Sequence, residues 1–164
     1  MPTKEGSHDG RDPGDSRIDH PFLFRPGTWR AEGEYRDAAG RGAPVSGETT
    51  IRHEERKWHF DGVLRVRGDR PALQHNRYEI EPFSEGARST HWSSSNPVLG
   101  TLAGRFVLAG DAILSFYASP TGRYRGYECL QRRDERRYSV RGAMMDEDKV
   151  ISTWVLELTA QMPL

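Results

Sequence analysis

Short runs of alternating polar and apolar residues follow one another along most of this chain, and this pattern constrains its fold more than any other feature. From His20 onward the runs are separated by Gly, Asp, Asn and Pro at a spacing of roughly ten residues. Between Lys57 and Arg67, apolar side chains recur at every second position. A period of two puts alternate side chains on opposite faces of a strand. We therefore predict a meander of antiparallel strands with one buried face.

Ten runs of this kind are present, and Gly-containing or acidic turns join several of them into hairpins. Ten short strands are too many for one open sheet, and closure removes the exposed edges of a sheet. The only candidates for a brief helix are 21–24 and 70–74. The predicted strands lie at 29–36, 47–54, 57–67, 76–83, 88–94, 101–109, 111–118, 122–131, 135–144 and 150–158.

The chain has 164 residues, close to the commonest size of a single domain. Residues 1–20 are mostly Gly, Asp, Arg, Ser and Pro, with no large aliphatic or aromatic side chain before Ile18. Such a segment cannot bury enough apolar surface to offset the entropy of ordering. We predict a disordered tail over 1–20 and one all-β domain over 21–164, a closed antiparallel up-and-down barrel of about eight to ten strands.

Charge and cysteine content exclude several classes of partner. Lys plus Arg (24) equals Asp plus Glu (24), so no net field attracts nucleic acid. No run of eighteen apolar residues and no signal-peptide core occurs, which predicts no membrane insertion. Cys129 is the lone cysteine, which is typical of a cytoplasmic protein. The excess of Arg over Lys fits either codon bias or bidentate anion recognition.

Local motifs for metal, nucleotide or nucleophilic chemistry are missing from the sequence. His53, His59, His75 and His91 stand on separate predicted strands without metal-ligand spacing. No G-x-S-x-G elbow, phosphate-cradling glycine loop or paired cysteine is present. We therefore predict neither a metal site nor a cofactor.

Gly27-Thr28-Trp29, at the start of the first strand, resembles the G-x-W element that opens the barrels of the calycin superfamily, the lipocalins and fatty-acid-binding proteins. The plan of about ten up-and-down strands over 25–162 is similar too. The resemblance implies that Trp29 plugs one end of the barrel beneath a basic side chain, for which Arg141 is one candidate. It also implies an interior that holds a small ligand.

The sequence departs from the better-defined calycin subfamilies. Secreted lipocalins have disulfides and signal peptides, and the haem-binding nitrobindin-like barrels use a histidine in the C-terminal part, whereas the last histidine here is His91. Fatty-acid binders hold a carboxylate with an Arg-x-Tyr pair. Arg136 and Tyr138 have that spacing, one strand earlier than in those proteins.

The apolar phase of each strand predicts which side chains face the interior. A tyrosine that points inward brings apolar bulk and one hydroxyl that needs a partner. Several inward tyrosines exceed what a dry core needs, which favours a ligand pocket with Trp29 among its walls. The predicted ligand-binding residues are Tyr35, His53, Trp58, Phe60, Tyr78, Trp92, Ser94, Phe106, Arg136 and Trp154.

Glu128 is the most informative candidate, because a buried carboxylate without a partner has a raised pKa and can transfer protons. In an enzyme, Glu128 would act with Tyr124 or Tyr138. A shift of one residue in phase would instead send Glu128 to solvent and bring 125, 127 and 129 inside. Arg136 is open to the same two interpretations. If it points inward, it captures a ligand carboxylate or pairs with Glu128. If it points outward, it belongs to a solvated hairpin tip.

Three functions are compatible with this sequence. The first is binding of one small apolar or amphipathic molecule inside the barrel, with the polar segment 90–97 either at the barrel mouth or in a plain loop. The second is an isomerase, cyclase or lyase that uses the same pocket on a small metabolic intermediate. The third is a barrel with a filled core that engages another protein or forms a homodimer.

Overall fold

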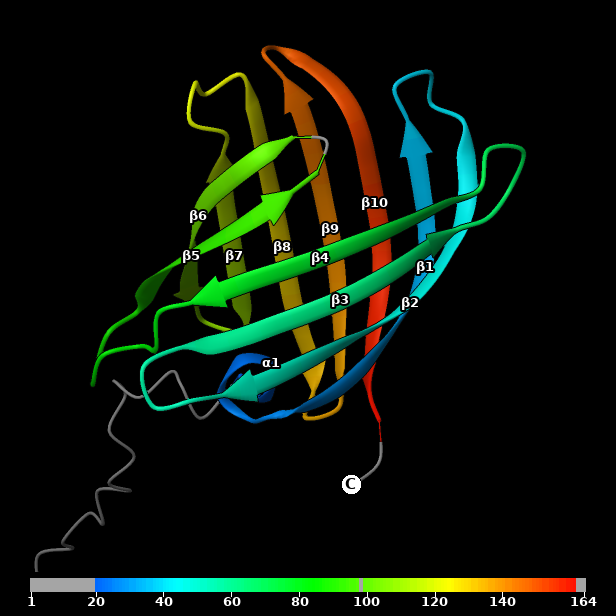
Figure 1. Ribbon diagram of the computed structural model, residues 1–164. Coiled ribbons are helices and arrows are strands. Elements are labelled where there is room, and N and C mark those ends of the chain that lie inside the picture. The colour runs from blue at the N-terminus through cyan, green and yellow to red at the C-terminus, as the bar shows by residue number, and fades with distance from the viewer. Residues whose placement is uncertain (1–19, 98, 162–164) are drawn as a thin grey trace, which may run out of the picture.

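The computed structural model describes residues 20–97 and 99–161, and it is a closed barrel of ten antiparallel strands (Figure 1). Each strand pairs with the next along the chain, and β10 pairs with β1 to close the barrel. This confirms the predicted closed all-β barrel. Of the predicted tail over 1–20, residues 1–19 lie outside the described residues, and His20 is buried. The strands are β1 (Gly27–Asp37), β2 (Gly42–His53), β3 (Trp58–Val66), β4 (Ala72–Ile80), β5 (Ser89–Asn96), β6 (Gly100–Ala109), β7 (Ala112–Ala118), β8 (Tyr124–Asp134), β9 (Arg137–Asp146) and β10 (Lys149–Ala160).

Two local expectations are wrong, and both concern polar strand segments. The proposed helix at 70–74 is absent because β4 already begins at Ala72, which pairs with Val66 of β3. All four residues of 72–75 are exposed, so no apolar alternation marked this segment as a strand. The interpretation of 90–97 as a plain loop is also wrong, because most of this polar segment belongs to β5.

The brief helix α1 (Pro21–Phe24) closes one end of the barrel (Figure 1). Phe22, only 2% exposed, packs edge-on against Trp29 with ring centroids 5.3 Å apart. The resemblance correctly placed Trp29 at a barrel end, but its basic partner is not Arg141, which is exposed on the outer face. The rings that contact Trp29 are those of Phe22 and Tyr138. An aromatic layer therefore seals this end.

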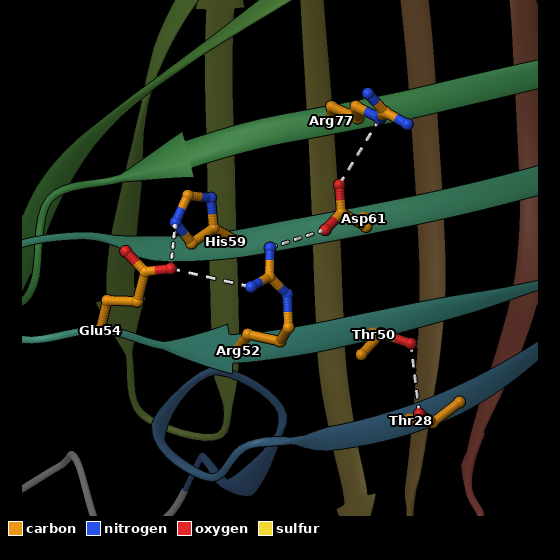
Figure 2. A network of polar contacts seen from close by, with 7 residues as sticks. All are labelled: Thr28, Thr50, Arg52, Glu54, His59, Asp61 and Arg77. Carbon is orange, nitrogen blue, oxygen red and sulfur yellow. Dashed lines mark hydrogen bonds and ion pairs between the residues drawn. The ribbon is translucent and has the colours of Figure 1, made fainter.

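The outer face of β2, β3 and β4 carries a network of ion pairs (Figure 2). Asp61 lies between Arg52 and Arg77, at 3.5 Å and 3.7 Å, and Arg52 also reaches Glu54 at 3.7 Å. His59 faces the same glutamate at 3.4 Å and so lies outside the barrel. Exposed pairs of this kind contribute little stability. Arg52 and Arg77 on this face therefore have carboxylate partners.

Gly33 marks a point where two strands approach too closely for a side chain. A Cβ on Gly33 would lie 1.9 Å from the carbonyl oxygen of Val155 on β10. We expect Gly33→Ala to lower the free energy of unfolding by about 2 kcal/mol, because backbone rather than a side chain must move. Gly27→Ala is the matched control, since nothing lies within 4 Å of its Cβ position. Equal urea denaturation midpoints for the two variants would contradict this reason for the glycine.

Candidate functional site

The half of the interior opposite α1 is accessible to solvent, and we call it the mouth half. It lies toward the turns that join β1 to β2, β7 to β8 and β9 to β10 (Figure 1). Inward residues at the α1 end are closed off, with Tyr138 and Ile80 both 0% exposed. Val45, Val66 and Ser152 in this half are buried. Other inward residues of the mouth half are only partly buried. They include Tyr35, Asn76, Tyr78, Tyr117, Glu128, Met144 and Trp154.

The barrel wall is weakest between β4 and β5. Only three residue pairs join these strands, from Tyr78 with Ser94 to Ile80 with Trp92. The segment 72–77 pairs with β3 on one side and has no partner from β5 on the other. The two strands diverge toward the mouth in Figure 1. Asn76 of β4, in the segment without a β5 partner, is partly buried.

Glu128 of β8 points into this half of the barrel. The indole Nε1 of Trp154 donates a hydrogen bond of 2.7 Å to its Oε2. Within the described residues, no other hydrogen bond and no ion pair reaches the Glu128 carboxyl group. Tyr127, on the opposite phase of the strand, is 46% exposed on the outer face. The inward phase of Glu128 is thus confirmed, and the alternative with residues 125, 127 and 129 inside is wrong.

Gly142 makes the contact between Glu128 and Trp154 geometrically feasible. Glu128 pairs with Gly142 on β9, and Gly142 pairs in turn with Trp154 on β10, so the contact spans two strand spacings. The indole lies across the glycine, since a Cβ there would be 2.1 Å from Cε2 of Trp154. The same arrangement holds Tyr117, whose ring lies over Gly126 of β8. Facing glycines thus let large rings lie flat along the inner wall.

A row of stacked rings forms the wall on the other side of the interior. Phe60 stacks on Tyr78 with centroids 4.6 Å apart, and Tyr78 stacks on Trp92 at 4.2 Å. Trp92 also contacts the ring of Tyr117, at 5.2 Å and a tilt of 54°. Aromatic faces in this arrangement favour a flat apolar ligand surface.

Burial raises the pKa of Glu128 to about 7, and the Trp154 hydrogen bond opposes part of that rise. Burial, together with the charge of Glu128, raises the pKa values of Tyr78 and Tyr117 above their ordinary range. These tyrosines therefore stay protonated at neutral pH. Glu128 exchanges its proton near neutrality, so it can act as donor or acceptor toward a bound molecule.

The predicted site residues fall into two groups along the barrel axis. His53 belongs to the closed end, where its Nε2 donates to the carbonyl of Leu23 at 2.8 Å and its ring stacks on Trp58 at 4.0 Å. It therefore anchors α1. The predicted residues near the closed end are His53, Trp58, Phe60, Phe106 and Tyr138. Those on the inner wall farther toward the mouth are Tyr35, Tyr78, Trp92, Ser94, Tyr124, Glu128 and Trp154.

The predicted inward position of Arg136 is wrong. Arg136 is exposed in the turn before β9, where its guanidinium donates to the carbonyl of Ala160 at 3.0 Å. Because β9 begins at Arg137, Arg136 lies in the β8–β9 turn, where the period of two that placed Arg136 and Tyr138 on one face does not hold. The Arg-x-Tyr spacing therefore forms no ligand clamp.

The tyrosines near Glu128 differ from those predicted. Tyr124 lies four residues along the same strand, about 13 Å away between Cα atoms. The hydroxyl of Tyr138 lies 3.3 Å from Nδ1 of His20, beside the plug at the closed end. Sequence reasoning missed Tyr117, and it missed Ser115, which pairs directly with Glu128. The alternation of Ile113, Ser115 and Tyr117 in the predicted strand 111–118 was the signal that could have identified both.

No group of three or more His, Cys, Asp or Glu side chains in 20–97 and 99–161 could hold a metal ion. Within the same residues, no helix is long and apolar enough to cross a membrane.

Comparison with known proteins gives structural likeness alone. No family model and no curated protein matches the chain. The S-type phycobiliprotein lyase CPES from Guillardia theta is similar in structure, with a TM-score of 0.63 and 9% identity over 93% of this chain and 100% of that one. Rv2717c from M. tuberculosis has a TM-score of 0.64 and 14% identity over 92% of this chain and 99% of that one. The fold is a calycin-like barrel, as the G-x-W element implied.

Proposed function

We propose that the mouth half of the barrel binds one small amphipathic molecule with a flat apolar body and a hydrogen-bond donor. The observation that carries this proposal is the Glu128 carboxyl group, which has the Trp154 indole as its only hydrogen-bond partner within the described residues. A polar group in an apolar wall is costly unless it is satisfied. A ligand donor that meets Glu128 would complete its hydrogen bonds.

The surrounding residues support the same ligand class. The wall near Glu128 is aromatic, because the rings of Tyr78, Trp92 and Tyr117 contact one another in a row. The charge of Glu128 acts on the two tyrosines of this row. No basic side chain contributes to the pKa of Glu128. The site therefore favours a neutral N–H, a hydroxyl or a basic nitrogen over a carboxylate. This differs from the ligand chemistry of an Arg-x-Tyr clamp.

Titration with N-phenyl-1-naphthylamine, a flat apolar fluorophore with one N–H, tests this proposal. We expect saturable binding of one molecule per chain and roughly tenfold weaker binding in Glu128→Gln, because a charged acceptor is lost. Glu48→Gln, on the exposed face of β2, is the matched control and should bind like the wild-type chain. Non-saturable binding, or equal binding by both variants, would count against the proposal.

A second candidate function is supported by the pKa of Glu128 near 7. A carboxyl group that is half protonated at neutral pH can serve as a general acid or base, as an isomerase, cyclase or lyase would require. Its partners would then be Tyr117 and Tyr78 rather than Tyr124 and Tyr138. In that case, turnover would depend on a single ionisation near pH 7 and would be lost in Glu128→Gln.

A further inference from the structure

A second concave surface lies on the outer wall of the barrel, across strands β4 to β8, and we call it the outer groove. Its volume is about 760 Å³, within the range of roughly 300–1,000 Å³ typical of sites for small molecules. Small residues on the outward phase, Ser93, Ala103 and Ala118, leave this face hollow. Most of the lining residues are on the outward phase, and Trp92 and Tyr117 of the inner wall also border the groove.

The floor of the outer groove is aromatic. Phe116 is 43% exposed and Tyr127 is 46% exposed, although both are large apolar side chains on neighbouring strands. Their rings meet edge to face, with centroids 6.0 Å apart and planes at 82°. An exposed aromatic pair inside a concave surface is a frequent mark of a binding site.

The rim of the outer groove is cationic. It includes the guanidinium groups of Arg56, Arg105 and Arg125. None of the three has a carboxylate partner within the described residues: Arg105 contacts His91 at 3.2 Å and Arg125 donates to the carbonyl of Gly122 at 3.0 Å. By contrast, Arg52 and Arg77 on the face shown in Figure 2 are paired with carboxylates.

The acidic side chains of the outer groove do not balance these arginines. Glu79 is held by Lys57 at 2.9 Å, and each neutralises the other. Glu81 remains as one further carboxylate on the lining. Three guanidinium groups against one carboxylate leave an excess of positive charge around an aromatic floor. Guanidinium groups bind carboxylates and phosphates through paired N–H donors and stack on aromatic faces.

We propose that the outer groove is a second binding site, for a small anion with a flat apolar body, such as an aromatic carboxylate. The apolar body would lie on Phe116 and Tyr127, and the anionic group would meet Arg105 and Arg125. This proposal does not depend on the interior site, because the four side chains that would recognise the anion, Phe116, Tyr127, Arg105 and Arg125, are on the outward phase of their strands.

Titration with 2-naphthoate, followed by NMR of the arginine Nε–H signals, tests the outer groove. We expect saturable binding that weakens about fivefold to tenfold in Arg125→Gln and in Phe116→Ser. Arg141→Gln is the matched control, since Arg141 is exposed on the outer face of β9 and does not line the groove. Inorganic phosphate and 2-naphthol each carry half of the recognised chemistry and should bind at least tenfold more weakly.

The indole N–H signal of Trp154 separates this proposal from the interior one. We expect it to stay in place while 2-naphthoate saturates the groove. A Trp154 shift with unmoved Arg105 and Arg125 signals would assign the anion to the interior and overturn the groove proposal. Equal weakening by Arg125→Gln and Arg141→Gln would also overturn it, since it would indicate diffuse charge attraction alone.

Discussion

Glu128→Gln is expected to unfold at higher urea concentration than the wild-type chain at pH 8, with a gain of about 3 kcal/mol in the free energy of unfolding. Burial raises the pKa of Glu128 to about 7 in the folded chain, against an ordinary carboxyl value of 4.5. The folded state therefore binds the proton more tightly than the unfolded state. Stability falls as the pH rises from about 4.5 to 7, and it stays lowered above that window.

The gain in Glu128→Gln should disappear at low pH. Near pH 4 the glutamic acid is protonated in both states, so glutamine and glutamic acid differ little in charge. Glu48→Gln is the matched control, because Glu48 is exposed on β2 and its replacement should change stability by less than about 0.5 kcal/mol. A wild-type chain that matches Glu128→Gln at both pH 8 and pH 4 would show that Glu128 keeps an ordinary pKa.

Gly142→Ala is expected to lower the free energy of unfolding by about 3 kcal/mol, since the new methyl group overpacks the wall and the indole must give up its hydrogen bond. Its Cβ would lie 2.1 Å from Cε2 and 2.4 Å from Nε1 of Trp154. Displacement of the indole should also remove the group that lowers the pKa of Glu128, which then rises further. Chemical denaturation and a carboxyl NMR titration measure the two effects.

A double-mutant cycle separates the proposed cause from a general intolerance of Gly142. In a Trp154→Ala background the indole is gone, so Gly142→Ala should cost less than about 1 kcal/mol. The coupling between the two substitutions is then about 2 kcal/mol. Additive costs would mean that the methyl group conflicts with backbone rather than with Trp154, and the role assigned to Gly142 would be wrong.

The barrel could be predicted from sequence because most strands bury one face. The alternation of Trp58, Phe60, Gly62 and Leu64 is visible in the chain and matches inward positions of β3. The start of β4 could not be predicted, because residues 72–75 are exposed on both phases where β5 has turned away. Apolar alternation marks a strand that buries one of its faces. The start of β4 buries neither face, so it shows no such alternation.

The site was predicted in part, for a related reason. The alternation within a regular strand correctly predicted that Glu128 points inward. It failed for Arg136, because Arg136 lies in the turn before β9 rather than in a strand. No pattern within a single strand could identify Trp154 as the hydrogen-bond partner of Glu128. Trp154 lies two strands away, and only the closed topology with Gly142 between them brings the indole to the carboxyl group.

The indole N–H signals of the four tryptophans offer the most direct test that the mouth half binds a ligand at Glu128. Two-dimensional NMR would follow them as N-phenyl-1-naphthylamine is added. We expect the Trp154 signal to move to saturation, because its N–H donates to Glu128, while Trp29, 4% exposed at the closed end, stays in place. An unmoved Trp154 signal at saturating probe would contradict a ligand site at Glu128.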